Sequence, residues 1–329
     1  MKILVIGGTV FLGKHIVKKA LKRKHDVTIF HRGKHNTEFE QNVKEIFGDR
    51  RKEIHKLERE NFDYVIDTCG YFPGDVEKSV NVLKGNIDKY LFVSSISVYK
   101  NFNVDEITEE SPVEYKEEEE LENKITNETY GPYKARCERV VRENLKEKSV
   151  VVRPGLIAGP GDPSDRFTYW VKRIEKGGKI IAPGKKSKRI QFIDVRDLAE
   201  WIIKLGEDKK SGIYNAVGPS KNINMEELLN ICRTEINKKA RFIWMDENFL
   251  LKEEVIPWSD LPLWLPDSMN MGGMMKVSKK MAAENGLSYR KVRDTINDTL
   301  KWFNNNRTEL KAGLDLEKEK KLIKKYNKI

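Results

Sequence analysis

Two side chains that could exchange a proton with an alcohol lie in the segment YGPYK. Tyr130 and Lys134 are four positions apart, so on a helix they share one face. A phenol is a weak acid with a usual pKa of about 10, and a nearby ammonium favours the phenolate. Lys134 is therefore expected to lower the pKa of Tyr130, which would act as acid or base on a hydroxyl or carbonyl group.

Ser95 lies in the segment FVSSISVY, at the end of a predicted strand. A hydroxyl at this place can hold the substrate oxygen, while its neighbour Ser94 is expected to point to the other face of the sheet. A Tyr–Lys pair alone is more often a solvated surface pair. In this chain the pair follows a glycine-rich turn and the SSISVY segment, and this order of motifs favours a catalytic role for the pair.

The segment ILVIGGTVFLG, residues 3–13, reads as a strand, a glycine-rich turn and the start of a helix. Gly7 and Gly8 permit a tight turn, and Gly13 permits close packing of the helix on the strand. A pyrophosphate needs such a turn, because the N–H groups of a helix N-terminus must approach it closely. Val10 stands where a middle glycine is expected, so the motif depends on its position after the first strand of a βαβ chain.

The residues after the second predicted strand decide which dinucleotide would bind. An acidic residue here would bind the ribose hydroxyls of NAD. The chain has His31, Arg32, Gly33 and Lys34 instead. Arg32 could pair with a 2′-phosphate, so NADP is favoured over NAD, the alternative being that Arg32 stacks on the adenine. Asp49, after the third strand, is expected to approach the adenine amino group.

Short apolar runs alternate with helix-length segments in the first half of the chain. Strands are predicted at 2–6, 26–31, 43–47, 63–67, 90–94 and 149–153, and helices at 12–22, between 67 and 90, and at 130–147. This alternation predicts an α/β Rossmann fold with a doubly wound parallel sheet. Further on, helices are expected at 166–176 and 197–205, strands at 191–195 and 213–217, and mostly helix from Asn224.

These elements divide the chain into two regions. Residues 1–155, with 190–218 returning to them, are predicted to form the dinucleotide-binding Rossmann core. Residues 156–189 and 219–329 are predicted to form a smaller, mostly helical C-terminal region that binds the substrate. Within it, an aperiodic stretch rich in Pro, Trp and Met is either a pocket wall or a packed loop, and Asp315 is expected to cap a terminal amphipathic helix.

The composition limits the classes of function. Of the 329 residues 39% are hydrophobic and 34% are charged, which is typical of a globular protein with a charged surface. The net charge of +11 could attract an anionic partner, but Lys interleaved with Glu favours a solvated surface. Three scattered cysteines without a nearby His argue against disulfides and against a metal site. No segment is long enough to span a membrane, and a cytoplasmic location is expected.

Six segments together resemble the NAD-dependent epimerase/dehydratase family, the extended and atypical short-chain dehydrogenases/reductases: GGTVFLG, DTCGY, FVSSISVY, YGPYKARCE, RPGLIAGPGDPSDRF and QFIDVRDLAEW. The resemblance runs from Met1 to about Val217 and weakly to Asn304, and it is closest to an atypical subgroup with the glycine motif GGxxxxG. Members of that subgroup have been described as isoflavone reductases, sugar dehydratases or RNA-binding proteins. The resemblance implies NAD or NADP as cofactor and a homodimer as a common assembly.

The departures from the family pattern bear on the substrate. Dehydratases carry an Asp-Glu pair where this chain has Ile96 and Ser97, so a 4,6-dehydratase is not expected. Nucleotide-sugar epimerases hold the pyrophosphate with an Asn and an Arg at the positions of Leu156 and Ile190, and Arg189 lies one place off. A nucleotide-linked sugar is thus in doubt but left open. Arg166, Arg189 and Arg196 are candidates for an anionic substrate, with a salt bridge as the alternative for each.

The resemblance and the residues lead to one set of expected sites. The catalytic set is Ser95, Tyr130 and Lys134, and no metal ligand is expected. The cofactor-binding set is Gly7, Gly8, Thr9, Val10, Phe11, Leu12, Gly13, His31, Arg32, Asp49, Cys69, Gly70, Ser94, Tyr130, Lys134 and Pro154. The substrate-binding set is Ser95, Leu156, Arg166 and Arg189.

The expected activity is hydride transfer between a nicotinamide and a secondary alcohol or ketone of a small substrate. Such an enzyme is an epimerase if the ketone is reduced again on its other face before the cofactor leaves, and a reductase otherwise. Two alternatives stay open. One is an RNA-binding protein on the same scaffold, and the other is a redox sensor that binds the cofactor without catalysis.

Overall fold

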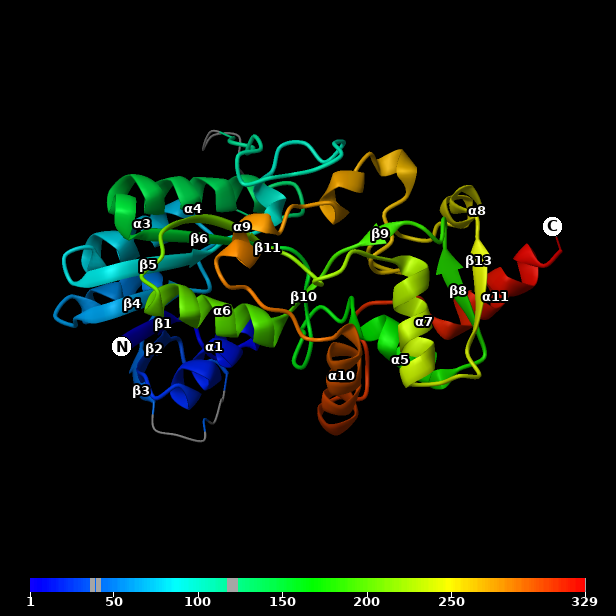
Figure 1. Ribbon diagram of the computed structural model, residues 1–329, viewed down its shortest axis with the longest axis horizontal. Coiled ribbons are helices and arrows are strands. Elements are labelled where there is room, and N and C mark those ends of the chain that lie inside the picture. The colour runs from blue at the N-terminus through cyan, green and yellow to red at the C-terminus, as the bar shows by residue number, and fades with distance from the viewer. Residues whose placement is uncertain (36–38, 40–42, 117–123, 329) are drawn as a thin grey trace.

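A seven-stranded parallel sheet forms the centre of the larger lobe of the molecule (Figure 1). The computed structural model describes residues 1–35, 39, 43–116 and 124–328. The strands lie in the order β11-β6-β5-β4-β1-β2-β3, and every neighbouring pair is parallel. Their bounds are β1 Lys2–Ile6, β2 Asp26–His31, β3 Lys44–Phe47, β4 Phe62–Asp67, β5 Ile87–Val93, β6 Ser149–Pro154 and β11 Gly212–Ala216. The predicted Rossmann-like α/β fold is confirmed.

The order of the strands creates a crevice beside β1. From β1 the chain first adds β2 and β3 on one side and then β4, β5 and β6 on the other. At such a switch point, the loops that leave neighbouring strands diverge at the carboxyl edge of the sheet. The glycine-rich turn follows β1, and the segments with Cys69 and Ser95 follow β4 and β5, so the fold brings these residues to the same edge.

Helices cover both faces of the sheet because successive strand residues alternate between the faces. Ile3 and Val5 pack with residues of α1 and α6 in one core, whereas Leu4 and Ile6 pack with residues of α3 and α4 in another. The helices of these layers are α1 Phe11–Lys22, α6 Val195–Glu207, α3 Pro73–Leu83 and α4 Tyr130–Leu145. Among the described residues, no helix is both long and apolar enough to cross a membrane.

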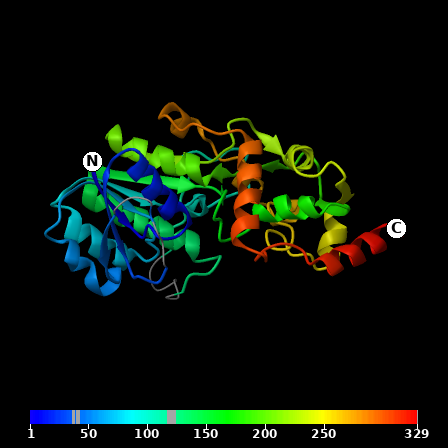
Figure 2. The same cartoon turned by 90° about the horizontal axis from the view of Figure 1, so that it is seen from below.

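A second, smaller lobe lies beside the sheet and has its own apolar core (Figure 2). Its helices are α5 Thr168–Lys176, α7 Met225–Glu235, α8 Glu247–Lys252, α10 Val292–Asn306 and α11 Leu316–Tyr326, while α9 Lys280–Glu284 packs near β11. Its strands include β8 Lys179–Pro183 and β13 Arg241–Met245, which pair in parallel, and β9 Arg189–Ile190, which pairs with β12 Ile223–Asn224. A further short pair, β7 Ile157–Ala158 with β10 Ile193–Asp194, packs in part against the core beside the large sheet.

Strand β13 interrupts the mostly helical character that the sequence predicts after Asn224. Apart from Arg241, the residues of its sequence RFIWM are β-branched, aromatic or apolar, which suits a strand. Five residues are too few to show a period of two clearly, and their partner β8 lies far away in the sequence. The local sequence alone therefore does not predict the pairing with β8 that stabilises β13.

The terminal helix α11 is held in place by a buried ion pair. Asp315 accepts hydrogen bonds from the N–H groups of Glu317 and Lys318 and so caps the helix, as predicted. In the first turns of the helix, Glu319 Oε2 accepts from Arg173 Nε of α5 at 2.7 Å, and Glu319 Oε1 accepts from the N–H of Ile181 in β8 at 3.0 Å. One carboxylate thus joins three elements of the smaller lobe.

Replacing Glu319 by Ala is expected to destabilise the protein by about 3–5 kcal/mol, because Arg173 would stay buried without its carboxylate. Glu317→Ala is the matched control, since Glu317 pairs with Lys320 on the exposed side of the same helix and its loss should change stability little. Urea unfolding of the wild type and both variants measures the difference. Equal stabilities of the two variants would show that the ion pair does not anchor α11.

Candidate active site

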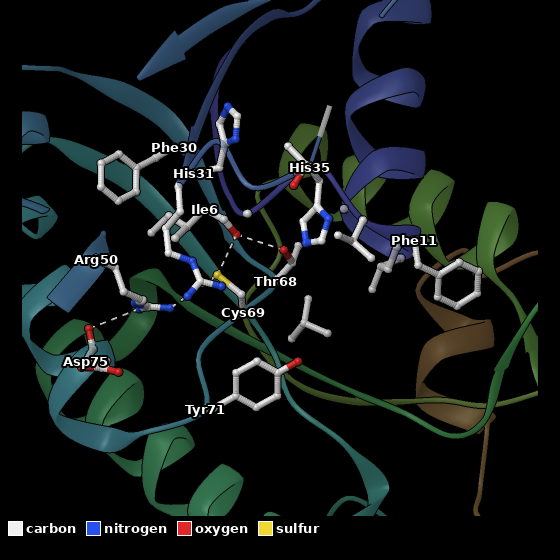
Figure 3. A pocket seen from close by; sticks show the side chains of 18 of the residues that line it. Ile6, Phe11, Phe30, His31, His35, Arg50, Thr68, Cys69, Tyr71 and Asp75 are labelled. Carbon is white, nitrogen blue, oxygen red and sulfur yellow. Dashed lines mark hydrogen bonds between the residues drawn. The ribbon is translucent and has the colours of Figure 1, made fainter. Parts of the chain in front are cut away.

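A pocket of about 790 Å³ lies at the carboxyl edge of the sheet, over the switch point. Its walls come from the glycine-rich turn after β1, the segments that follow β2 to β6, and the first turns of α4 (Figure 3). Among the residues that the structure describes, no group of three His, Cys, Asp or Glu side chains could hold a metal ion.

The glycine-rich turn leaves a helix N-terminus open toward the pocket. Gly7 and Gly8 have φ angles of +103° and +90°, which side chains rarely allow. A Cβ on Gly13 would lie 2.8 Å from the nitrogen of Gly8, so α1 begins directly against the turn. Val10 precedes α1 without a side-chain cap. An uncapped helix N-terminus behind such a turn binds anions, and this cradle fits the pyrophosphate of a dinucleotide.

Basic side chains from the segment after β2 line one end of the pocket. Arg32, Lys34 and His35 are exposed and line the wall there. The imidazole of His31 is buried and lies 2.7 Å from a carboxylate oxygen of Glu45. This end of the pocket therefore offers positive charge to the adenosine half of a dinucleotide.

Asp49 lines the same end of the pocket and has a structural task as well. Its Oδ1 accepts a hydrogen bond from the N–H of Arg51 at 2.9 Å and caps α2, Arg50–Glu53. One carboxylate oxygen is thus committed to the helix. The second oxygen is the one that could approach an adenine amino group.

A buried ion pair beside the pocket holds the end of β4, from which the next pocket segment starts. Arg50 donates to both oxygens of Asp67, at 2.9 and 2.8 Å, and Tyr90 donates to the same carboxylate at 2.9 Å. Arg50 keeps the pKa of Asp67 below its usual value although burial alone would raise it. Beyond Asp67, the side chains of Thr68 and Cys69 both point to the carbonyl of Ile6 in β1 (Figure 3). The next residues thereby pass close to β1 and the glycine-rich turn.

The three expected catalytic residues lie together at the other end of the pocket. Ser95 Oγ accepts from the N–H of Ser97 at 3.1 Å and donates to Ser97 Oγ at 3.0 Å. Helix α4 begins at Tyr130, and a Cβ on Gly131 would lie 2.0 Å from the carbonyl oxygen of Ser97. Only glycine at position 131 lets the helix start so close to the turn after β5. This contact brings Tyr130 to Ser95.

The ammonium of Lys134 is buried and held by the main chain. It donates to the carbonyls of Gly70 and Val93, each at 2.8 Å. It also lies 4.7 Å from the ring centroid of Phe92 and 5.0 Å from that of Tyr71. Two of its three N–H groups are therefore used by the ends of β4 and β5, and one remains for a phenolate or a ribose hydroxyl.

The pKa of Tyr130 differs from the sequence-based prediction. Burial raises it above the ordinary value, and a hydrogen bond with Ser95 counteracts part of this effect. Lys134 was expected to lower it. Instead, the ammonium lowers the pKa of Tyr71, although burial leaves that pKa raised overall. The reason is the position of the ammonium, which the two carbonyls hold beside the ring of Tyr71.

Most of the expected cofactor-binding residues line this one pocket. They are Gly7, Gly8, Thr9, Val10, Phe11, Leu12, Gly13, His31, Arg32, Asp49, Cys69, Ser94, Tyr130, Lys134 and Pro154. Gly70 contributes the carbonyl that Lys134 binds. Ser94, expected on the other face of the sheet, lines the pocket beside Ser95, because β5 ends at Val93 and the alternation of strand residues ends with it.

The expected substrate-binding residues do not all line the pocket. Ser95 lines the pocket, whereas Leu156, Arg166 and Arg189 do not. Leu156 packs against the core of the smaller lobe, and the guanidinium of Arg166 lies 5.7 Å from the ring of Trp258. Arg189 belongs to β9.

Sequence reasoning overlooked several pocket residues, among them Tyr71 and Arg50. Tyr71 follows directly on Cys69 and Gly70 in the DTCGY segment, so its place in the chain could have indicated it. Arg50 gave no such signal, since a basic residue in the run DRRK is normally exposed.

Gly13→Ala is expected to weaken NADP⁺ binding by at least about tenfold, because the added Cβ pushes α1 away from the turn that receives the pyrophosphate. Gly74→Ala is the control, because a Cβ there meets nothing within 4 Å. Calorimetric titration with NADP⁺ measures both variants, and circular dichroism confirms that they are folded. Undiminished NADP⁺ binding by folded Gly13→Ala would contradict the assignment of the turn.

Comparisons with known proteins agree with this geometry. Residues 3–217 match the model of the NAD dependent epimerase/dehydratase family. The chain is 26% identical over 315 residues to the chloroplast stem-loop binding protein of 41 kDa b from Arabidopsis thaliana, an alignment that covers 82% of this chain and 79% of that protein.

Solved structures share the fold. A UDP-glucose 4-epimerase has a TM-score of 0.69 at 19% identity and covers 93% of this chain and 99% of its own. The UDP-glucuronic acid 4-epimerase from Bacillus cereus in complex with NAD has a TM-score of 0.68 at 15% identity and covers 93% of this chain and 97% of its own. The family match extends over most of the chain and includes the glycine-rich turn and the Ser95, Tyr130 and Lys134 segments. The chain therefore belongs to the NAD dependent epimerase/dehydratase family and is an NAD(P)-dependent enzyme of the short-chain dehydrogenase type.

Proposed function

We propose that the chain is an NADP(H)-dependent oxidoreductase or epimerase acting on a secondary alcohol or ketone through Ser95, Tyr130 and Lys134. One observation carries the proposal: these three side chains line one end of a pocket whose other walls are a glycine-rich helix N-terminus and a basic rim. The chemistry that a bound nicotinamide supplies is hydride transfer to or from a carbinol carbon.

Each of the three side chains has a separate task. Ser95 holds the substrate oxygen beside Tyr130. Tyr130 takes the hydroxyl proton when an alcohol is oxidised and returns it when a ketone is reduced. Lys134 uses its remaining N–H group to favour the phenolate or to hold a ribose hydroxyl. The substrate lies between the Rossmann core of residues 1–155 and the region formed by 156–189 and 219–329.

The preference for NADP over NAD rests on the segment after β2. The chain has no acidic residue among positions 31–35 to bind the ribose hydroxyls of NAD. Arg32, Lys34 and His35 line the pocket there. A 2′-phosphate carries about two negative charges, so these side chains favour NADP, with the guanidinium of Arg32 as the best-suited partner.

Arg32→Ala is expected to weaken NADP⁺ binding by about tenfold and to leave NAD⁺ binding within about twofold, because only NADP⁺ has the phosphate that Arg32 would pair with. Calorimetric titration of the wild type and the variant with each dinucleotide measures this. Wild-type protein that binds NAD⁺ as well as or better than NADP⁺ would refute the preference and favour the epimerase over the reductase.

Tyr130→Phe is expected to lower turnover by about 10²–10⁴-fold and to change NADP⁺ affinity little, because the phenol transfers the proton without being needed for cofactor binding. Burial raises the pKa of Tyr130, so at neutral pH the phenol is protonated. In the wild type, alcohol oxidation should therefore accelerate as pH rises toward that pKa, and ketone reduction should slow. Steady-state rates across pH check both directions. Activity retained by Tyr130→Phe would exclude Tyr130 as the acid or base.

RNA binding is the second candidate function, because a relative is named as a stem-loop binding protein. The charge of the chain is also uneven. Residues 1–155 hold 28 Lys and Arg against 27 Asp and Glu, whereas residues 156–329 hold 34 against 24. Filter binding of a stem-loop RNA over a salt series tests this function. An affinity that falls steeply with salt supports phosphate contacts, and weak binding at every salt concentration rejects the candidate.

A further inference from the structure

The charged groups of the pocket are concentrated at one end. Arg32, Lys34 and His35 follow β2, and Arg50 and Arg51 follow β3, so all five belong to the adenosine end. At the other end, Lys134 is the one cationic side chain among the described residues that line the pocket, and two of its N–H groups are already bound to carbonyls. The reacting end therefore lacks the cations that a second pyrophosphate would need.

The arginines that could have supplied such charge are engaged or lie elsewhere. Arg196 forms ion pairs with Asp194 and Asp298. Arg166 and Arg189 do not line the pocket. The walls of the pocket also include uncharged residues, among them Ile125, Gly155, Ile157 and Pro163. This composition fits a substrate without phosphate groups.

Tyr71 gives the reacting end an exposed aromatic face. Its side chain is buried on one side against Lys134, yet 45% of the residue is exposed. Its ring centroid lies 6.5 Å from that of Tyr130, and its hydroxyl points into the pocket (Figure 3). A Cβ on Gly70 would lie 2.6 Å from the ring of Phe92, so the chain passes close to β5 just before Tyr71. Tyr71 is thereby held beside Tyr130.

We propose that Tyr71 is a specificity-determining residue, and that the substrate is an uncharged cyclic alcohol or ketone whose C–H face packs on the Tyr71 ring while its oxygen lies at Ser95 and Tyr130. The proposal rests on the proposed function. It distinguishes this chain from the UDP-glucose 4-epimerase that shares its fold, because a ring without a nucleotide needs an apolar platform and no phosphate-binding cations.

The test begins with wild-type protein whose binding of NADPH has been measured by calorimetry. Failure to bind NADPH defeats the proposed function itself. Reduction of cyclohexanone, 2-hydroxycyclohexanone and 1-tetralone by NADPH is then followed by absorbance. At least one of the three ketones is expected to be reduced with saturation, and UDP-glucose is expected not to bind the complex with NADP⁺. Reduction of none of the ketones, or tight binding of UDP-glucose, overturns the substrate class.

Substitutions at Tyr71 separate its role from that of Lys134. Tyr71→Ala is expected to raise the KM of the reduced ketone by about tenfold and to keep kcat within about threefold, whereas Tyr71→Phe keeps the ring and should keep KM within about twofold. Tyr115→Ala is the control, because Tyr115 is 41% exposed and lies outside this pocket. An unchanged KM in Tyr71→Ala overturns the specificity role, and a loss confined to kcat would make Tyr71 a positioning residue for Lys134 instead.

Discussion

The ammonium of Lys134 is the group on which the reacting end of the pocket depends. It is buried, no described carboxylate pairs with it, and two carbonyls and two aromatic faces compensate for the lost hydration. Through these contacts one side chain joins the catalytic helix to the ends of β4 and β5. Among the residues that the structure describes, the third N–H group has no carbonyl acceptor, so it can bind a ribose hydroxyl or a phenolate.

Local patterns in the sequence predicted the elements well, and contacts between distant segments account for what was missed. Strands β1 and β2 were predicted with the bounds that the structure has, since buried apolar runs between turns are a strong signal. The pair of Arg50 and Asp67 was not predicted, because a buried arginine looks like a surface arginine until its partner is placed. The pKa of Tyr130 was predicted with the wrong sign, because spacing on a helix gives the shared face of Tyr130 and Lys134 but not the carbonyls that hold the ammonium. The assignment of the individual site residues to cofactor and substrate remains a prediction.

The fold and the chemistry of the pocket provide different kinds of information. The seven-stranded sheet, the glycine-rich turn and the Ser, Tyr and Lys residues are general features that position a dinucleotide and an oxygen atom. In the proposed function, the choice of substrate depends on other side chains around them, here Tyr71 and Ile157. Because Tyr71 and Ile157 lie outside the seven-stranded sheet, they can change without disturbing it. Likeness of fold to sugar-nucleotide epimerases is therefore compatible with a different substrate.

The link between Arg173 and Glu319 has a consequence for the order in which the chain is made. The ribosome releases the amino-terminal residues first, and the large sheet has all of its strands once β11 has emerged. Arg173 emerges early as well, yet its carboxylate partner lies 146 residues later, close to the carboxyl terminus. During synthesis the core of the smaller lobe therefore contains Arg173 without its carboxylate partner until α11 has been made. Closure of the smaller lobe therefore has to follow the synthesis of α11, and a nascent chain arrested before α11 would display a formed sheet beside an open lobe.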